Sequence, residues 1–155
     1  MNADTANASS PTVHASAVLV GPRAVLIRGP AGAGKSRLAL GLIQAADCGL
    51  LTFARLVGDD RVELVACQGR LLARPARALA GLIEVRGLGI RWVDYEPVAV
   101  VGLVVDLAVA EAERLPGAAA EQEVLGIRLP RLAIAPGSDP MPAVLARLLT
   151  LGAEV

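Results

Sequence analysis

The chain has 155 residues, which is enough for one domain with a sizeable buried core. Its composition is 54% hydrophobic but only 2% aromatic, so aliphatic side chains must build that core. The formal net charge is zero, which argues against binding to nucleic acid or an anionic membrane through bulk charge.

The first residues, 1–12, are small and polar, with neither a basic start nor an apolar run. They predict a disordered tail rather than a signal peptide, followed by a single domain over 13–155. The most apolar later stretch, residues 98–110, is interrupted by Asp106 and is shorter than the roughly 20 residues needed to span a bilayer. Cys48 and Cys67 form no metal-ligand spacing. We therefore expect a soluble protein of a reducing cytoplasm.

The first half of the domain predicts a strand, a glycine-rich loop and a helix in that order. Apolar runs at 17–20 and 24–27 flank Gly21-Pro22 and predict a β-hairpin. The glycine-rich stretch follows directly. Residues 37–46 then repeat leucine, isoleucine and alanine at helical spacing.

The rest of the chain predicts more hairpins than a doubly wound sheet would contain. The predicted elements are a strand at 50–57 that ends on Gly58-Asp59-Asp60, a hairpin at 61–75, a flexible segment around Gly87 and Gly89, a buried strand at 98–105, an edge hairpin at 123–136 and a closing helix at 139–153 capped by Asp139. The edge position follows from Pro130, which cannot donate a ladder hydrogen bond. The fold class is therefore mixed α/β.

The glycine-rich stretch "GPAGAGKS" fills the pattern G-x-x-x-x-G-K-S. Its glycines allow the backbone to curl so that successive N–H groups face a bound anion, and the following helix adds its positive end. The predicted nucleotide-binding residues are Gly29, Pro30, Ala31, Gly32, Ala33, Gly34, Lys35 and Ser36. A glycine-rich turn that matches the pattern by chance is the alternative, and the predicted strand and helix on either side argue against it.

Two side chains of the loop carry specific chemistry. Lys35 is the only lysine in the chain, and its compact ammonium group on a flexible stem suits the β- and γ-phosphates of a nucleotide better than a forked guanidinium would. Ser36 offers a hydroxyl group to Mg²⁺. Nucleotide binding is therefore the main prediction from the residues themselves.

Phosphoryl transfer also needs a carboxylate near the loop, and there are two candidates. Asp106 ends the apolar run "VVGLVVD", as a metal-binding carboxylate often does, but it could also simply make a turn. The Asp59-Asp60 pair ends the predicted strand after the loop helix. It could equally be present only because Gly-Asp-Asp favours a turn. His14, the only histidine, lies just before the first strand, and by itself this position suggests a surface residue without a functional role.

Several of these pieces combine into a family pattern. The segments "VHASAVLVGPRAVLIRGPAGAGKSRLALGLI", "ARLVGDD" and "GLIEVRGLGI" resemble the catalytic domain of the HPr kinase/phosphorylase family over residues 13–150. The loop is shared by many enzymes, whereas the other two segments are more specific. The resemblance is to the compact form of the family, which lacks the separate N-terminal domain of the longer members.

The resemblance implies an ATP-dependent protein-serine kinase that phosphorylates HPr or a related phosphocarrier of the phosphotransferase system. It implies a P-loop fold like that of phosphoenolpyruvate carboxykinase, with Mg²⁺ as the metal. Many members also remove the phosphate with inorganic phosphate, and well-studied members assemble as hexamers. No nucleic-acid or membrane partner is implied.

Carried over to this sequence, the family assigns roles to the loop and to residues elsewhere in the chain. Lys35 and Ser36 would bind the phosphates and Mg²⁺, with Asp59 as the acid/base. Asp60 and His14 would support Asp59. Glu84, as a metal-site residue, and Arg86, as a catalytic one, fall in the signature segment near the site. Asp106 would then be only a structural strand end.

Three positions depart from the family pattern. Arg37 stands where an acidic residue commonly follows the loop serine, and Ala135 and Ser138 stand where arginines are expected. These departures weaken the expectation of the reverse reaction. They also keep open a nucleotide-binding sensor without transferase activity.

The loop alone also leaves open a small-molecule kinase. Such an enzyme would need an arginine-bearing lid, and residues 108–123 offer only Arg114.

Overall fold

The computed structural model describes residues 11–112 and 120–150. Residues 1–10 of the tail predicted at 1–12, the segment 113–119 with Arg114, and residues 151–155 lie outside the described residues. Thr12, at the end of the predicted tail, already pairs with Glu63 in a short strand. Within the described residues, neither α-helix is long and apolar enough to cross a membrane.

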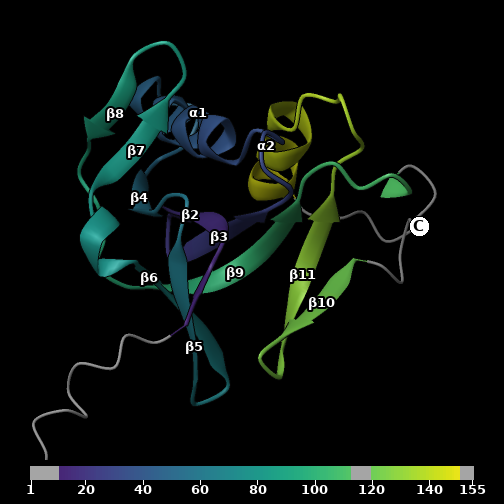
Figure 1. Ribbon diagram of the computed structural model, residues 1–155. Coiled ribbons are helices and arrows are strands. Elements are labelled where there is room, and N and C mark those ends of the chain that lie inside the picture. Colours follow the sequence, from purple (N-terminus) through teal and green to yellow (C-terminus); the bar gives the residue numbers. More distant parts are fainter. Residues whose placement is uncertain (1–10, 113–119, 151–155) are drawn as a thin grey trace, which may run out of the picture.

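Strands dominate the described chain, with one α-helix after the glycine-rich loop and one at the C-terminal end (Figure 1). The elements are β1 (Thr12–Val13), β2 (Ala15–Val20), β3 (Arg23–Arg28), α1 (Lys35–Asp47), β4 (Ala54–Gly58), β5 (Val62–Cys67), β6 (Arg70–Pro75), the 3₁₀ turn η2 (Arg77–Leu79), β7 (Leu82–Val85), β8 (Gly89–Trp92), β9 (Ala99–Asp106), β10 (Glu121–Val124), β11 (Ile127–Ala133) and α2 (Met141–Leu149). The mixed α/β class predicted from the sequence is confirmed.

The main sheet is mixed, and its parallel part lies next to the loop. Its strands follow the order β1-β5-β6-β9-β3-β2-β4, and β11 also pairs with β9 and carries β10. Strand β9 runs parallel to both β3 and β11, whereas the other pairs in this sheet are antiparallel. The carboxyl ends of β3, β9 and β11 therefore meet at one place, which is where ligands bind in open parallel sheets.

Apolar side chains alternate along the central strands and build two cores, one on each face of the sheet. On β3, Val25 and Ile27 pack with Leu38 and Leu42 of α1 in one core. Leu26 of the same strand belongs to the other core, among side chains of β5 and β6. Figure 1 shows both helices on one side of the sheet and the β5–β6 hairpin extending from the other. The loop is thus fixed between a buried strand and a buried helix.

The predicted hairpins at 17–27, 61–75 and 123–136 are all present. One predicted boundary shifts because local backbone hydrogen bonds decide it. The strand predicted from residue 50 begins only at Ala54, since the N–H groups of Leu50 and Leu51 bond back to the Ala45 carbonyl and close α1.

The segment predicted as flexible around Gly87 and Gly89 instead forms the β7–β8 hairpin. Both glycines take positive φ angles, 87° and 93°, which the turn requires.

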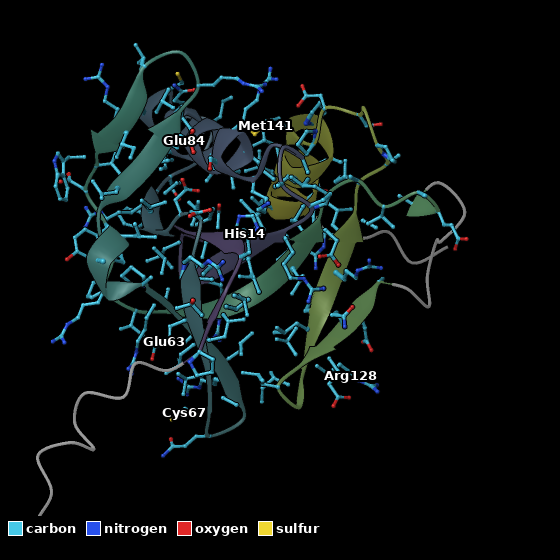
Figure 2. The ribbon with its side chains drawn as sticks, in the orientation of Figure 1. His14, Glu63, Cys67, Glu84, Arg128 and Met141 are labelled. Carbon is cyan, nitrogen blue, oxygen red and sulfur yellow. The ribbon has the colours of Figure 1, made fainter. Side chains whose placement is uncertain are left out.

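The closing helix α2 starts at Met141, with Pro140 in the N-cap position. The Asp139 carboxylate accepts a hydrogen bond from the Met141 N–H at 3.1 Å, so the predicted residue serves the helix start from one position further out. This helix packs on α1 at close range: a side-chain carbon at Gly41 would lie 2.9 Å from the sulfur of Met141, which is labelled in Figure 2.

Candidate active site

The glycine-rich loop leaves β3 at Gly29 and enters α1 at Lys35. Gly32 and Gly34 adopt φ angles of 79° and 100°, which strain any residue with a side chain. A side-chain carbon at either glycine would meet no protein atom within 4 Å. The glycines are therefore needed for the backbone path, and the space in front of them is open to a ligand.

Lys35 lies at the inner side of this loop and is only 7% exposed. Its Nζ donates to the carbonyls of Gly29 and Pro30 at 2.8 and 3.1 Å, so the ammonium group holds the loop in its curled form. An ammonium group has three N–H donors, which leaves a third for an anion. No acidic residue occupies the first turn of α1 itself, so none of the side chains in that turn offsets the positive end of the helix. These features fit nucleotide phosphates.

Asp59 connects the loop to the end of β4, and it is only 3% exposed. The Ser36 hydroxyl lies 2.8 and 2.9 Å from its two carboxylate oxygens. The Ser16 hydroxyl donates to Oδ1 at 2.6 Å, and the backbone N–H of Glu84 donates to Oδ2 at 3.1 Å. A buried carboxylate is thus directly joined to the loop serine predicted to bind a metal.

Ser16 and the Glu84 backbone amide are the two partners of Asp59 that the sequence analysis missed. Ser16 did leave a signal, because it is the one polar residue among the buried residues Ala15–Val18 of β2. A fully buried hydroxyl needs a hydrogen-bond partner. Its partner could not be named from the sequence, since Asp59 lies 43 residues further along the chain.

Asp60 turns away from Asp59 and pairs with His14. Asp60 has a φ angle of 66°, and its Oδ1 lies 2.9 Å from His14 Nε2. Their side chains are 63% and 42% exposed. The structure therefore brings together the three residues predicted for acid/base chemistry, with Asp59 buried and the His14–Asp60 pair at the surface beside it.

Glu84 and Arg86 occupy β7 and the following turn, and both are exposed. Glu84 reaches Asp59 through its backbone N–H. Figure 2 shows Glu84 on β7 and His14 at the start of β2, with Arg128 at the far end of the β10–β11 hairpin. Arg37 is also exposed, in the first turn of α1. Ala135 and Ser138 lie in the turn before α2, where the Ser138 N–H bonds to the Ala135 carbonyl at 3.2 Å.

Asp106, the other carboxylate considered from sequence, bonds to two arginines. Arg28 donates to both of its oxygens at 2.7 and 2.8 Å, and Arg131 Nε donates to Oδ2 at 2.5 Å. Burial by itself raises the pKa of Asp106, but the hydrogen bonds and charges of Arg28 and Arg131 outweigh it and hold the pKa below its ordinary value. Guanidinium groups thus occupy the carboxylate that a metal would need.

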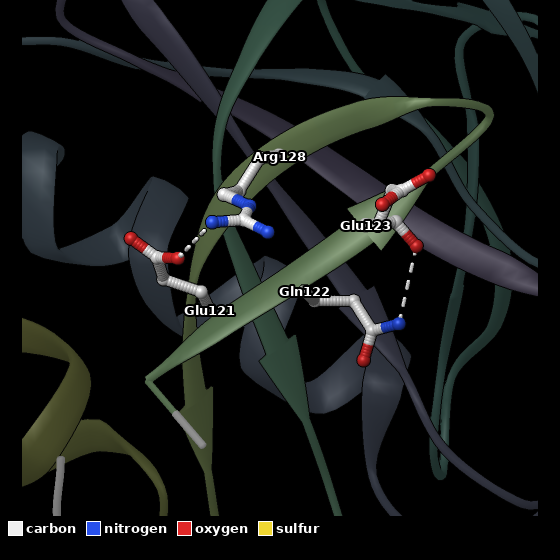
Figure 3. Close-up of a pocket in the computed structure, with 4 residues that line it drawn as sticks. All are labelled: Glu121, Gln122, Glu123 and Arg128. Carbon is white, nitrogen blue, oxygen red and sulfur yellow. Dashed lines mark hydrogen bonds and ion pairs between the residues drawn. The ribbon is translucent and has the colours of Figure 1, made fainter. Parts of the chain in front are cut away.

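Two surface hollows lie away from the loop. One, of about 280 Å³, is lined by polar residues of the β10–β11 hairpin, where Arg128 pairs with Glu121 at 3.5 Å (Figure 3). The other, of about 570 Å³, lies between the end of α1 and residues 52–55 and 92–94. Neither is lined by a loop residue, so the candidate site is defined by the loop and Asp59.

With this geometry in place, comparison with known proteins decides the family. The family model of the HPr Serine kinase C-terminal domain matches residues 5–142. The chain belongs to this family.

Curated relatives and a solved structure agree with this assignment. The HPr kinase/phosphorylase of Streptococcus thermophilus is 32% identical over 137 residues, covering 79% of this chain and 41% of the relative. That of Clostridium beijerinckii is 40% identical over 78 residues, covering 50% of this chain and 24% of the relative. The chain thus spans less than half the length of these relatives.

The solved structure of the Hpr(Ser) kinase/phosphatase from Coxiella burnetii matches 90% of this chain and 88% of its own chain, with a TM-score of 0.69 and 25% identity. The fold predicted from the resemblance is confirmed.

Proposed function

We propose that this chain is the catalytic domain of an ATP-dependent kinase that phosphorylates a serine of an HPr-like phosphocarrier protein. The observation that carries the proposal is the direct hydrogen bonding of buried Asp59 to Ser36 of the glycine-rich loop. Family membership over residues 5–142 supplies the class of reaction and of protein substrate.

The loop supports the nucleotide part of the proposal. Its open glycine backbone, the positive end of α1 and the ammonium group of Lys35 together present donors and positive charge to the β- and γ-phosphates of ATP. A loop already held by Lys35 does not have to reorganise when the phosphates bind. This preorganisation is where most of the acceleration of phosphoryl transfer should arise.

Ser36 and Asp59 would hold Mg²⁺, with the carboxylate of Glu84 as a further candidate from the predicted metal set. Mg²⁺ in such sites takes one or two protein oxygens together with phosphate oxygens and water, and when bound it neutralises charge on the transferred group. The fit rests on the chemistry of the donors, since a hydroxyl and a carboxylate already face each other at 2.8 Å.

Asp59 would accept the proton of the substrate serine. In the free protein its oxygens already receive bonds from Ser16, Ser36 and the Glu84 amide. If the Ser36 hydroxyl rotates toward the phosphates, one acceptor position on Asp59 becomes free. The substrate hydroxyl could then donate there while its oxygen attacks the γ-phosphorus and ADP leaves.

The His14–Asp60 pair and Arg86 would act at the edge of the site. The hydrogen bond to His14 holds the side chain of Asp60 in place. The left-handed backbone at Asp60 turns the chain sharply just after Asp59. Arg86 would contribute positive charge from the β7–β8 turn to the phosphates or to the entering protein. Both roles are electrostatic and positional.

The test is transfer of labelled phosphate from ATP to a purified HPr-like phosphocarrier of the same organism. We expect label on a serine with the unchanged chain. We expect turnover to fall below detection with Lys35→Ala. The loop loses the hydrogen bonds that hold it curled, and the phosphates lose the positive charge that would bind them. Arg23→Ala, an exposed cation in β3, is the matched control and should keep turnover.

Two outcomes would contradict the proposal. ATP binding with no transfer to any phosphocarrier would favour a sensor without transferase activity. Label found only on small metabolites would favour a small-molecule kinase.

A further inference from the structure

Asp106 ends β9 beside the first residue of the loop, and it is 8% exposed. Its carboxylate receives three guanidinium hydrogen bonds, two from Arg28 and one from Arg131. The three residues come from three different strands, β3, β9 and β11. One carboxylate therefore joins the ends of the three strands that form the parallel part of the sheet.

Backbone hydrogen bonds continue this connection past the strand ends. The Leu107 N–H donates to the Arg28 carbonyl, and the Ile134 N–H donates to the Asp106 carbonyl, each at 2.8 Å. Arg28 and Asp106 are directly opposite each other in the β3–β9 ladder. Since Arg28 is followed by Gly29, this is the last fixed point of the chain before the loop begins.

The loop also rests directly on this strand end. A side-chain carbon at Gly29 would lie 3.0 Å from Cβ of Leu107 and 3.3 Å from its carbonyl oxygen. The Gly29 carbonyl in turn accepts a hydrogen bond from Lys35. A shift of the β9 end relative to β3 would therefore move Gly29 and, through it, the ammonium group of Lys35.

We propose that Asp106 is a positioning residue for nucleotide binding, because it clamps Arg28 and Arg131 and so holds the first residue of the glycine-rich loop in its binding geometry. The inference rests on the proposed function only in requiring that the loop binds nucleotide. The sequence suggested that Asp106 is either a metal ligand or only the end of a strand. The proposed role differs from both.

Electrostatics and positioning predict opposite effects for Asp106→Asn. The substitution removes a negative charge near the phosphate site, which by charge alone should tighten the binding of an anion. Loss of the clamp should instead weaken binding, by about tenfold if the loop start shifts by a fraction of an ångström. Calorimetric titration of the purified chain with ADP measures the dissociation constant without any phosphocarrier.

The matched control is Glu96→Gln. It breaks the Arg55–Glu96 ion pair, which joins the start of β4 to the segment before β9 at 2.8 Å. Arg55 borders the hollow at the C-terminal end of α1, the opposite end of that helix from the loop. We expect this variant to bind ADP as the unchanged chain does, even where its melting temperature falls.

A second variant covers the case in which Asp106→Asn does not fold. Arg131→Lys keeps the positive charge but loses the Nε–H that bonds to Asp106. We expect ADP binding about threefold weaker with Arg131→Lys, an intermediate step toward the loss with Asp106→Asn.

The outcomes separate the hypotheses. Weaker ADP binding in both clamp variants but not in Glu96→Gln supports the inference. Unchanged or tighter binding in the folded clamp variants overturns it. Failure of the unchanged chain to bind ADP would instead overturn the proposed function.

Discussion

Two buried aspartates flank the same loop and differ in their partners. Asp59 directly follows β4 and receives hydroxyl and amide donors, which are neutral. Asp106 ends β9 and receives two guanidinium groups, which are permanently charged. In the proposed function, the carboxylate with neutral partners exchanges one of them for a substrate or a metal. Asp106, with charged partners, instead holds the ends of β3, β9 and β11 together.

Among changes at the two aspartates and their partners, the largest expected effect comes from Asp59→Asn. We expect transfer of phosphate to the phosphocarrier to fall by about 10²- to 10⁴-fold, the usual contribution of a general base. Binding of ADP in the absence of Mg²⁺ should stay within a few-fold, because the amide can still accept a bond from Ser36. Transfer assays and ADP titration on the same preparation measure both quantities. Transfer at a near-normal rate would remove Asp59 from the mechanism and leave the two aspartates equivalent.

A smaller effect should appear in the pH dependence of stability. The pKa of Asp106 is held below its ordinary value of 3.8, so its ion pairs contribute fully above that pH and are lost as the pH falls through the lower folded-state value. At pH 7 we expect Asp106→Asn to lower the free energy of unfolding by about 2 kcal/mol, less than for a fully buried pair because Arg28 is partly exposed.

The check is thermal unfolding of the two proteins from pH 7 to pH 3. The difference in melting temperature between them should shrink below about pH 4. A difference that stays constant to pH 3 would show that packing, and not the charge of Asp106, causes the loss.

The smallest expected effect concerns Ser16→Ala, which removes one neutral donor from Asp59. We expect a loss of about 1 kcal/mol in the free energy of unfolding, the usual value of one hydrogen bond, and a few-fold slower transfer. Ser138→Ala, at an exposed serine, is the control and should change neither quantity. Unchanged stability and unchanged transfer in Ser16→Ala would mean that Ser16 does not help to orient Asp59.

The local pattern of the chain determined the loop and most of the elements. The spacing of "GPAGAGKS" placed a strand before it and a helix after it, and both are present because the motif and the apolar periodicity act over a few residues. The hairpins followed from turn residues in the same way. Strand β4 was predicted too long because the end of α1 bonds back on itself through Leu50 and Leu51.

The residues alone left the choice between the two carboxylates open, the family resemblance favoured Asp59, and the tertiary structure joins Asp59 directly to the loop serine. Asp59 and Asp106 both end apolar strands, and their difference lies in residues far along the chain: Ser16 is 43 positions from Asp59, and Arg28 is 78 positions from Asp106. Such partners meet only through the order and direction of strands in the sheet, which hydrophobic spacing does not encode. The sequence therefore predicted where phosphates would bind, and the pairing of distant strands decided which acid lies beside the loop serine.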